Sequence, residues 1–126
     1  MTNTPIVTKE DSLKERALQI LNLRYPIESD IKSSYKKRIF EYHPDRHPKL
    51  RGNASEMREC EKKVMVVNQA YELLLDVLNS GKIDVAKYCL LEDTELVQSL
   101  LPENVKPASL GKTEQELWIE KYGNLI

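Results

Sequence analysis

The sequence predicts an all-α protein, and three observations carry that prediction. No segment alternates apolar and polar residues with the period of two that a half-buried strand requires. Apolar residues instead recur at intervals of three and four, which is the repeat of one face of an α-helix. Three stretches also begin with a helix-cap pattern, in which Ser, Thr or Asn is followed three residues later by Glu.

The first half of the chain predicts two helices separated by a proline. The first spans about residues 13–22, with Ser12 as its cap, and ends before Pro26. Proline lacks an N–H group and disfavours helical angles in the residue before it. The second helix therefore begins near Glu28 and ends before Pro44. One side of it carries an apolar stripe of Ile31, Tyr35, Ile39 and Tyr42.

A long helix follows an exposed loop at about residues 43–52. Asn53 and Glu56 form its predicted cap, and Gly81 follows its expected end near Asn79, which gives a length of ~37 Å at ~1.5 Å per residue. Its apolar seam recurs at alternating intervals of three and four: Met57, Cys60, Val64, Val67, Tyr71, Leu74 and Leu78. Such a seam predicts that the long helix packs on another helix. Because the loop at 43–52 joins one end of each, we expect the second helix and the long helix to lie antiparallel.

Toward the C-terminus the pattern is weaker. We expect short helices at about 83–91 and 94–101, a connector at 102–112, and a last helix at about 114–122. Trp118 in the last helix either packs on the domain or anchors a partner, and the sequence leaves both open.

Size and composition favour one soluble domain. The chain has 126 residues, of which 40% are apolar and 31% charged. Its longest apolar runs are four residues, far below the ~20 that a membrane-spanning helix needs. The first residues do not match a secretory signal, because they lack a basic segment followed by an apolar one. These features predict a cytoplasmic protein without a membrane span.

The cysteines and histidines predict neither a disulfide framework nor a metal site. Cys60 and Cys89 have no close spacing, and we expect reduced thiols. A metal site of His43, His47 and Cys60 matches no zinc spacing and lacks an evident fourth ligand. We therefore expect no metal and no cofactor.

The net charge of −1 hides an uneven distribution. Residues 32–51 hold seven basic and two acidic side chains, whereas residues 82–126 hold five basic and eight acidic ones. A basic patch on a nearly neutral chain predicts a docking face for an acidic partner. A helical nucleic-acid-binding module, a different class of function, would use Lys32, Lys36, Lys37, Arg46, Lys49 and Arg51. The sequence pI near 6.2 disfavours it, because dedicated nucleic-acid binders are usually basic throughout.

Residues 31–46 read IKSSYKKRIFEYHPDR, and residues 68–74 read NQAYELL. A basic helix, the tripeptide His-Pro-Asp, a loop and a long helix with this Ala-Tyr-Glu pattern together resemble the J-domain of the DnaJ family. The resemblance covers about residues 12–78. It divides the chain into a flexible N-terminus at 1–11, a J-domain at 12–80 and a helical C-terminal extension at 81–126.

The resemblance implies a co-chaperone that binds the ATP state of a DnaK-type 70 kDa heat-shock chaperone and stimulates its ATP hydrolysis, with no enzymatic chemistry of its own. By position, the chaperone-binding helix face would be Lys32, Tyr35, Lys36 and Lys37. The trigger would be His43, Pro44 and Asp45, followed by Arg46. The lack of Gly/Phe-rich and zinc-binding regions indicates the small specialised class, in which a C-terminal segment sets the target. The iron–sulfur-assembly type of J co-chaperone is a related alternative, which the long loop and the Asn-Gln-Ala-Tyr segment also resemble.

The sequence departs from the family pattern at several positions. Arg38 stands where a core leucine is usual, and we expect its guanidinium either to pass the seam toward Glu59 or Glu61 or to leave the seam locally wet. Three residues of the long helix also differ: Val64, which replaces a common phenylalanine, and Met65 and Asn68, which replace lysines that often help docking. The loop before the long helix is longer than usual. The basic fourth helix of many family members is not recognisable after Asp76.

Overall fold

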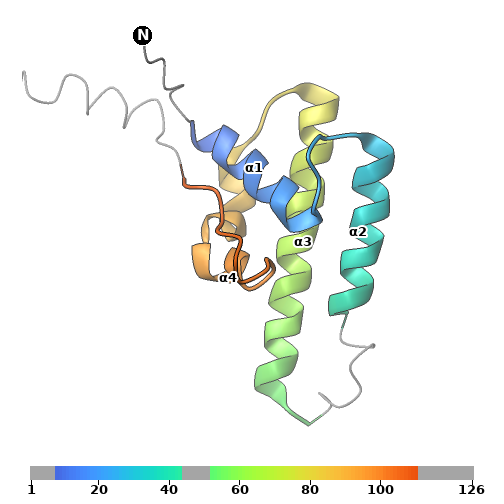
Figure 1. Ribbon diagram of the computed structural model, residues 1–126, viewed down its shortest axis with the longest axis vertical. Coiled ribbons are helices and arrows are strands. Elements are labelled where there is room, and N and C mark those ends of the chain that lie inside the picture. Colours follow the sequence, from blue (N-terminus) through green and yellow to red (C-terminus); the bar gives the residue numbers. More distant parts are fainter. Residues whose placement is uncertain (1–7, 44–51, 111–126) are drawn as a thin grey trace, which may run out of the picture.

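The described part of the protein is all-α, as the sequence predicts. The structure is a computed structural model, and it describes residues 8–43 and 52–110. Within these ranges the chain forms helices and no β-strand, in the order α1, α2, α3, a 3₁₀ helix η3, and α4 (Figure 1). No helix of this described part is long and apolar enough to cross a membrane. Both cysteines are free thiols.

Helix α1 spans Lys9–Leu21 and begins one turn earlier than predicted. The hydroxyl oxygen of Thr8 caps it by accepting a hydrogen bond from the backbone N–H of Asp11 at 3.2 Å. Ser12, the predicted cap, lies inside the helix and is buried, and its hydroxyl donates to the carbonyl of Thr8 at 3.0 Å. The helix ends at Asn22, which adopts the left-handed conformation with φ of 56°.

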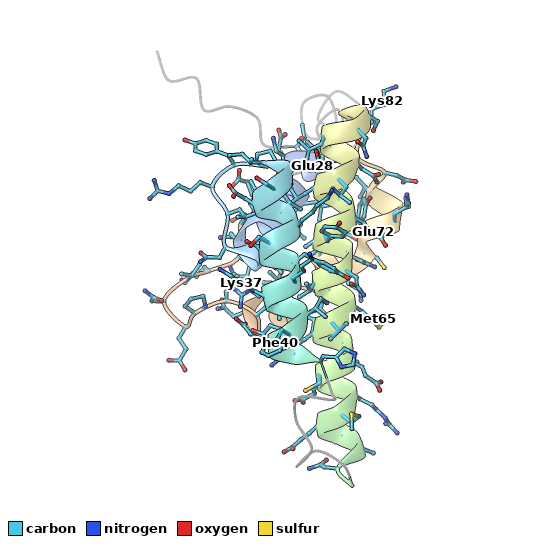
Figure 2. All side chains as sticks on the ribbon, turned by 90° about the vertical axis from the view of Figure 1, so that its right-hand side faces the viewer. Glu28, Lys37, Phe40, Met65, Glu72 and Lys82 are labelled. Carbon is cyan, nitrogen blue, oxygen red and sulfur yellow. The ribbon has the colours of Figure 1, made fainter. Side chains whose placement is uncertain are left out.

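Helices α2 (Glu28–Tyr42) and α3 (Ala54–Ser80) have the predicted boundaries to within about one residue. His43, which precedes a proline, has the extended angles φ −64° and ψ 132°. The side chain of Asn53 caps α3, and Gly81 ends it with φ of 70°. The two helices lie side by side and antiparallel (Figures 1 and 2), which confirms the predicted hairpin.

The core lies mainly on the side of α3 that faces α1, so the predicted seam describes only part of it. Val67 and Leu74 of the seam are fully buried, whereas Leu78 is 41% exposed. A second buried stripe of α3 consists of Val66, Ala70 and Leu73. The predicted seam describes only part of the core because two sides of α3 are covered. Helix α2 covers one side, and α1 together with η3 covers the other.

The C-terminal segment contains two short helices near the predicted positions. Residues Val85–Glu92 form η3, with a kink at Tyr88, and Thr94–Gln98 form α4. The first is a 3₁₀ helix, and the second is shorter than the predicted 94–101. The described residues after it, up to 110, have no regular structure. The predicted helix at 114–122 and Trp118 lie outside the described residues.

Arg16 of α1 ties the C-terminal segment to the body of the fold. Its guanidinium donates to the carbonyls of Leu91 and Ala108, at 2.8 and 2.7 Å, and to the hydroxyl of Thr94 at 3.0 Å. The residue is 2% exposed. Burial lowers the pKa of Arg16, and the nearby charge of Glu92 opposes that effect. Three distant points of the chain therefore meet at one buried cation.

Polar contacts with α3 also fix the C-terminal segment on the body of the fold. Tyr88 is fully buried, and its hydroxyl donates to the carboxylate of Asp76. Burial, and then the bond to Asp76, raise the pKa of Tyr88 well above the ordinary value of 10.0. The side-chain oxygen of Gln69 accepts from the N–H of Leu90 at 3.0 Å. Residues 85–108 thus share one core with α1 and α3.

Candidate functional site

Lys32 and Lys36 form an exposed basic side of α2. They are one helical turn apart, so their side chains leave the helix in similar directions. Lys32 forms an ion pair with Glu28 at 3.0 Å, and this bond raises the pKa of Lys32. Lys36 has no ion pair in the described part of the chain. We call Lys32 and Lys36 the basic side of α2.

Lys37 points away from the basic side of α2. It follows Lys36 by one residue, which is a rotation of about 100° around the helix. It lines a recess with Leu21, the last residue of α1, and Asn22, which follows the helix (Figure 2 labels Lys37 on α2). The structure therefore brings together two of the three lysines predicted for one docking face and places the third toward α1.

Tyr35 lies at the contact between α2 and α3. Its ring stacks on the ring of Tyr71, with centroids 4.1 Å apart, and its hydroxyl donates to the side-chain oxygen of Asn68 at 2.6 Å. Burial raises the pKa of Tyr35, and the charges of neighbouring groups add to this effect. Tyr35 thus holds the hairpin together, and Asn68 is its partner.

Arg38 does not reach the acidic residues that the sequence suggested. Its Nε donates to the carbonyl of Ile20 at 2.8 Å, and another of its nitrogens lies 3.2 Å from the carboxylate of Glu41. Arg38 therefore turns toward the C-terminal end of α1. Its ion-pair partner among the described residues is Glu41, so the expected pairing with Glu59 or Glu61 is wrong. Glu59 lines a groove beside α4.

His43 is exposed at the end of α2, where its N–H donates to the carbonyl of Ile39 at 2.8 Å. The other predicted trigger residues, Pro44 and Asp45, and Arg46 after them lie outside the described residues, as does His47. Their assigned roles stay predictions. Among the residues that the structure describes, no group of His, Cys, Asp and Glu is arranged to hold a metal ion.

Two exposed apolar side chains lie near the basic side of α2: Phe40, which the sequence analysis did not single out, and Met65, which it noted only as the replacement of a lysine. Phe40 of α2 is 56% exposed and Met65 of α3 is 53% exposed. The Tyr35–Tyr71 stacking and the placement of Lys63 over the ring of Tyr42 fix the antiparallel register, which puts Phe40 and Met65 at the same level (labelled in Figure 2). Phe40 lies outside the apolar stripe of α2, and this position in the sequence could have indicated that its ring is exposed.

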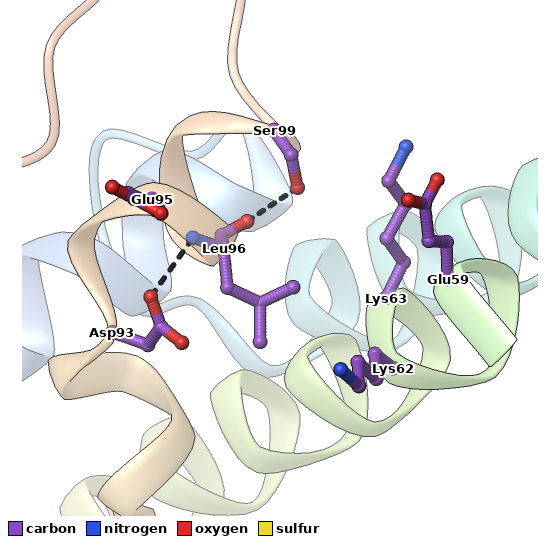
Figure 3. Close-up of a pocket in the computed structure, with 7 residues that line it drawn as sticks. All are labelled: Glu59, Lys62, Lys63, Asp93, Glu95, Leu96 and Ser99. Atoms are coloured by element: carbon purple, nitrogen blue, oxygen red, sulfur yellow. Dashed lines mark hydrogen bonds between the residues drawn. The ribbon is translucent and has the colours of Figure 1, made fainter. Parts of the chain in front are cut away.

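A polar groove of about 330 Å³ lies between α3 and α4 (Figure 3). Two carboxylates, Asp93 and Glu95, come from the α4 side, and two lysines, Lys62 and Lys63, come from α3. The carboxylate of Asp93 accepts from the N–H of Leu96 at 3.1 Å. The hydroxyl of Ser99 donates to the carbonyl of Leu96 at 2.5 Å. The Asp93 and Ser99 side chains therefore stabilise the α4 turn and do not form a nucleophile–base pair.

The family model for the DnaJ domain matches residues 18–80, which is half of the chain. The chain belongs to the DnaJ domain family. The match contains α2 and α3 and ends before η3 and α4. The basic side of α2 and the exposed His43 thus lie within the DnaJ domain.

Known relatives match the same region. The Chaperone protein DnaJ of Fusobacterium nucleatum is 41% identical over 59 residues, which cover 45% of this chain and 14% of the relative. The protein of the same name from Thermotoga petrophila is 39% identical over 49 residues, covering 39% and 12%. The J protein JJJ1 of Saccharomyces cerevisiae is 32% identical over 65 residues, covering 52% and 10%. The chain thus spans 10% to 14% of the length of these relatives. No solved structure matches it at a significant level.

Proposed function

We propose that the protein is a co-chaperone that docks on a DnaK-type 70 kDa heat-shock chaperone and stimulates its ATP hydrolysis. The carrying observation is the exposed position of His43 at the end of α2, next to Pro44 and Asp45 in sequence, within a DnaJ domain. The protein itself performs no chemistry in this proposal, and the hydrolysis takes place on the partner.

The geometry of the hairpin supports this role. Tyr35 stacks on Tyr71 and fixes α2 on α3, so the basic side of α2 is held in place before a partner arrives. Exposed lysines attract an acidic surface and raise the association rate, with an effect that salt screens. Pro44 holds His43 extended, which limits the conformational entropy lost on binding.

We further propose that the C-terminal segment contributes target specificity and that the protein works in the cytoplasm. Residues 85–108 form a surface that lies outside the DnaJ domain match, so they are available for a role of their own. The iron–sulfur-assembly type of J co-chaperone remains a variant of this proposal. The nucleic-acid-binding alternative is weakened by the placement of Lys37, because that lysine does not extend the basic side formed by Lys32 and Lys36.

Nucleotide-dependent binding separates these proposals. A purified DnaK-type chaperone is immobilised, and binding of the protein is followed by surface plasmon resonance with ATP or ADP present. We expect binding with ATP and much weaker binding with ADP. Equal binding in both states, together with micromolar binding to duplex DNA or RNA at physiological salt, would favour the nucleic-acid module instead.

A further inference from the structure

The C-terminal segment and the end of α1 enclose a recess whose use the proposed function does not specify. Its volume is about 380 Å³, within the range of small-ligand and side-chain pockets. Leu18 and Leu23 come from α1 and the turn after it, and Leu101 and Val105 come from the C-terminal segment. Gln19 and Asn22 also line this space, and we call it the apolar recess after its aliphatic side chains. It exists only because the segment folds back onto α1.

The wall of the apolar recess is fixed by hydrogen bonds. The amide nitrogen of Gln98 donates to the carbonyl of Val105 at 2.8 Å and to that of Pro102 at 3.3 Å. From the other side, Gln19 donates to the carbonyl of Lys106 at 3.0 Å and accepts from the N–H of Ala108 at 2.9 Å. A wall held at both ends loses little entropy when it binds a ligand.

Positive charge surrounds the apolar recess. Arg24 and Arg38 line it, and Lys37 lines an adjoining recess of about 320 Å³ that shares Asn22 and Arg38 with it. Among the described residues that line the two spaces, Glu41 is the one carboxylate, and it pairs with Arg38. Arg24 and Lys37 have no ion pair within the described part of the chain. The site therefore has an uncompensated positive rim.

We propose that the apolar recess binds an acidic peptide segment of a partner protein. One apolar side chain of the peptide fills the space between Leu18 and Leu101, and neighbouring Asp or Glu residues pair with Arg24 and Lys37. The inference rests on the proposed role of the C-terminal segment in target choice, and it names the site and the chemistry of the target. It also gives Lys37 a function separate from chaperone docking.

The test uses the full chain and amide NMR spectra titrated with a short peptide in which one leucine is flanked by glutamates. Two matched peptides carry serine in place of the leucine, or glutamines in place of the glutamates. We expect shifts at residues of the apolar recess with the first peptide and much smaller ones with either control. Absence of shifts there, or equal binding of the glutamine peptide, would overturn the proposal.

Three variants check the site. Val105→Glu is expected to weaken peptide binding at least about tenfold, because it adds a carboxylate to the recess, and Arg24→Glu about fivefold. Lys82→Glu changes an exposed lysine outside both recesses and should leave binding unchanged. An equal loss with Lys82→Glu would show non-specific attraction and refute the site. Both Val105→Glu and Arg24→Glu should still stimulate the chaperone ATPase, whereas failure of the wild type to stimulate would reject the proposed function alone.

Discussion

Replacing Arg16 tests whether the C-terminal segment is part of the folded domain. The substitution Arg16→Met keeps the length and the apolar stem of the side chain but removes all three hydrogen bonds. The bond to the carbonyl of Leu91 is buried, whereas those to Thr94 and Ala108 are only partly buried. In the variant, water can therefore hydrogen-bond the hydroxyl of Thr94 and the carbonyl of Ala108 more easily than the buried carbonyl of Leu91.

These contacts set the expected loss of stability. A buried carbonyl left without a donor costs about 1–3 kcal/mol, and bonds to a charged group contribute about 1.5–3 kcal/mol each. The gain from no longer burying a cation offsets part of this sum. We expect a net decrease of about 3 kcal/mol in the free energy of unfolding, or about 10 °C in Tm.

The assay is urea unfolding followed by circular dichroism, with amide hydrogen exchange as a second measurement. Arg24→Met is the matched control, because Arg24 is exposed and forms no ion pair in the described chain; its effect should stay within about 0.5 kcal/mol. Exchange in η3 and α4 should increase more than in α2 in Arg16→Met. Equal stability of the two variants would show that Arg16 does not anchor the C-terminal segment.

Three further perturbations follow from the same contacts. Tyr35→Phe should lower stability by about 1 kcal/mol in urea unfolding, since the side-chain oxygen of Asn68 loses its donor. Lys36→Glu should weaken chaperone binding more at low than at high ionic strength, which surface plasmon resonance can contradict. Because the pKa of Tyr88 is raised in the folded protein, the unfolded chain loses the hydroxyl proton of Tyr88 at a lower pH than the folded one. The contribution of this group to the free energy of unfolding is therefore complete below pH ~10 and falls above it. Between pH 8 and 11 the wild type should therefore lose more stability than Tyr88→Phe, by on the order of 1 kcal/mol in the free energy of unfolding.

Helix boundaries were predictable where a local signal decides them. The proline after His43 ends α2, the Asn53 side chain caps α3, and Gly81 supplies the left-handed residue that closes it. The start of α1 was missed because two caps compete there. Thr8 takes the role, and Ser12 satisfies its hydroxyl inside the helix.

Contacts between distant parts of the chain were not predictable from local patterns. Arg38 interrupts an apolar stripe, which signals an unusual environment, but its bond to the carbonyl of Ile20 depends on how α1 crosses the hairpin. The same holds for Arg16, whose partners lie 75 to 92 residues away in sequence. Periodicity shows that a side chain faces inward and does not show which helix it meets.

For the candidate site, the sequence predicted which residues take part, and the structure shows in which direction each side chain leaves its helix. The three lysines of α2 were expected on one docking face, yet adjacent residues on a helix differ by about 100° in direction. Lys36 stays on the basic side with Lys32, and Lys37 turns to the recess beside α1. Tyr35 was expected to share packing and docking, and its bond to Asn68 accounts for the packing part.

Single-turnover ATP hydrolysis by a DnaK-type chaperone measures whether the protein stimulates its proposed partner through His43. The rate is measured with the wild type, with His43→Gln, and with Lys82→Gln as an exposed control outside the basic side of α2. We expect the wild type and the control to raise the rate equally, whereas His43→Gln, shown by circular dichroism to be folded, should not raise it. Equal stimulation by all three proteins would show that His43 does not trigger ATP hydrolysis on the chaperone.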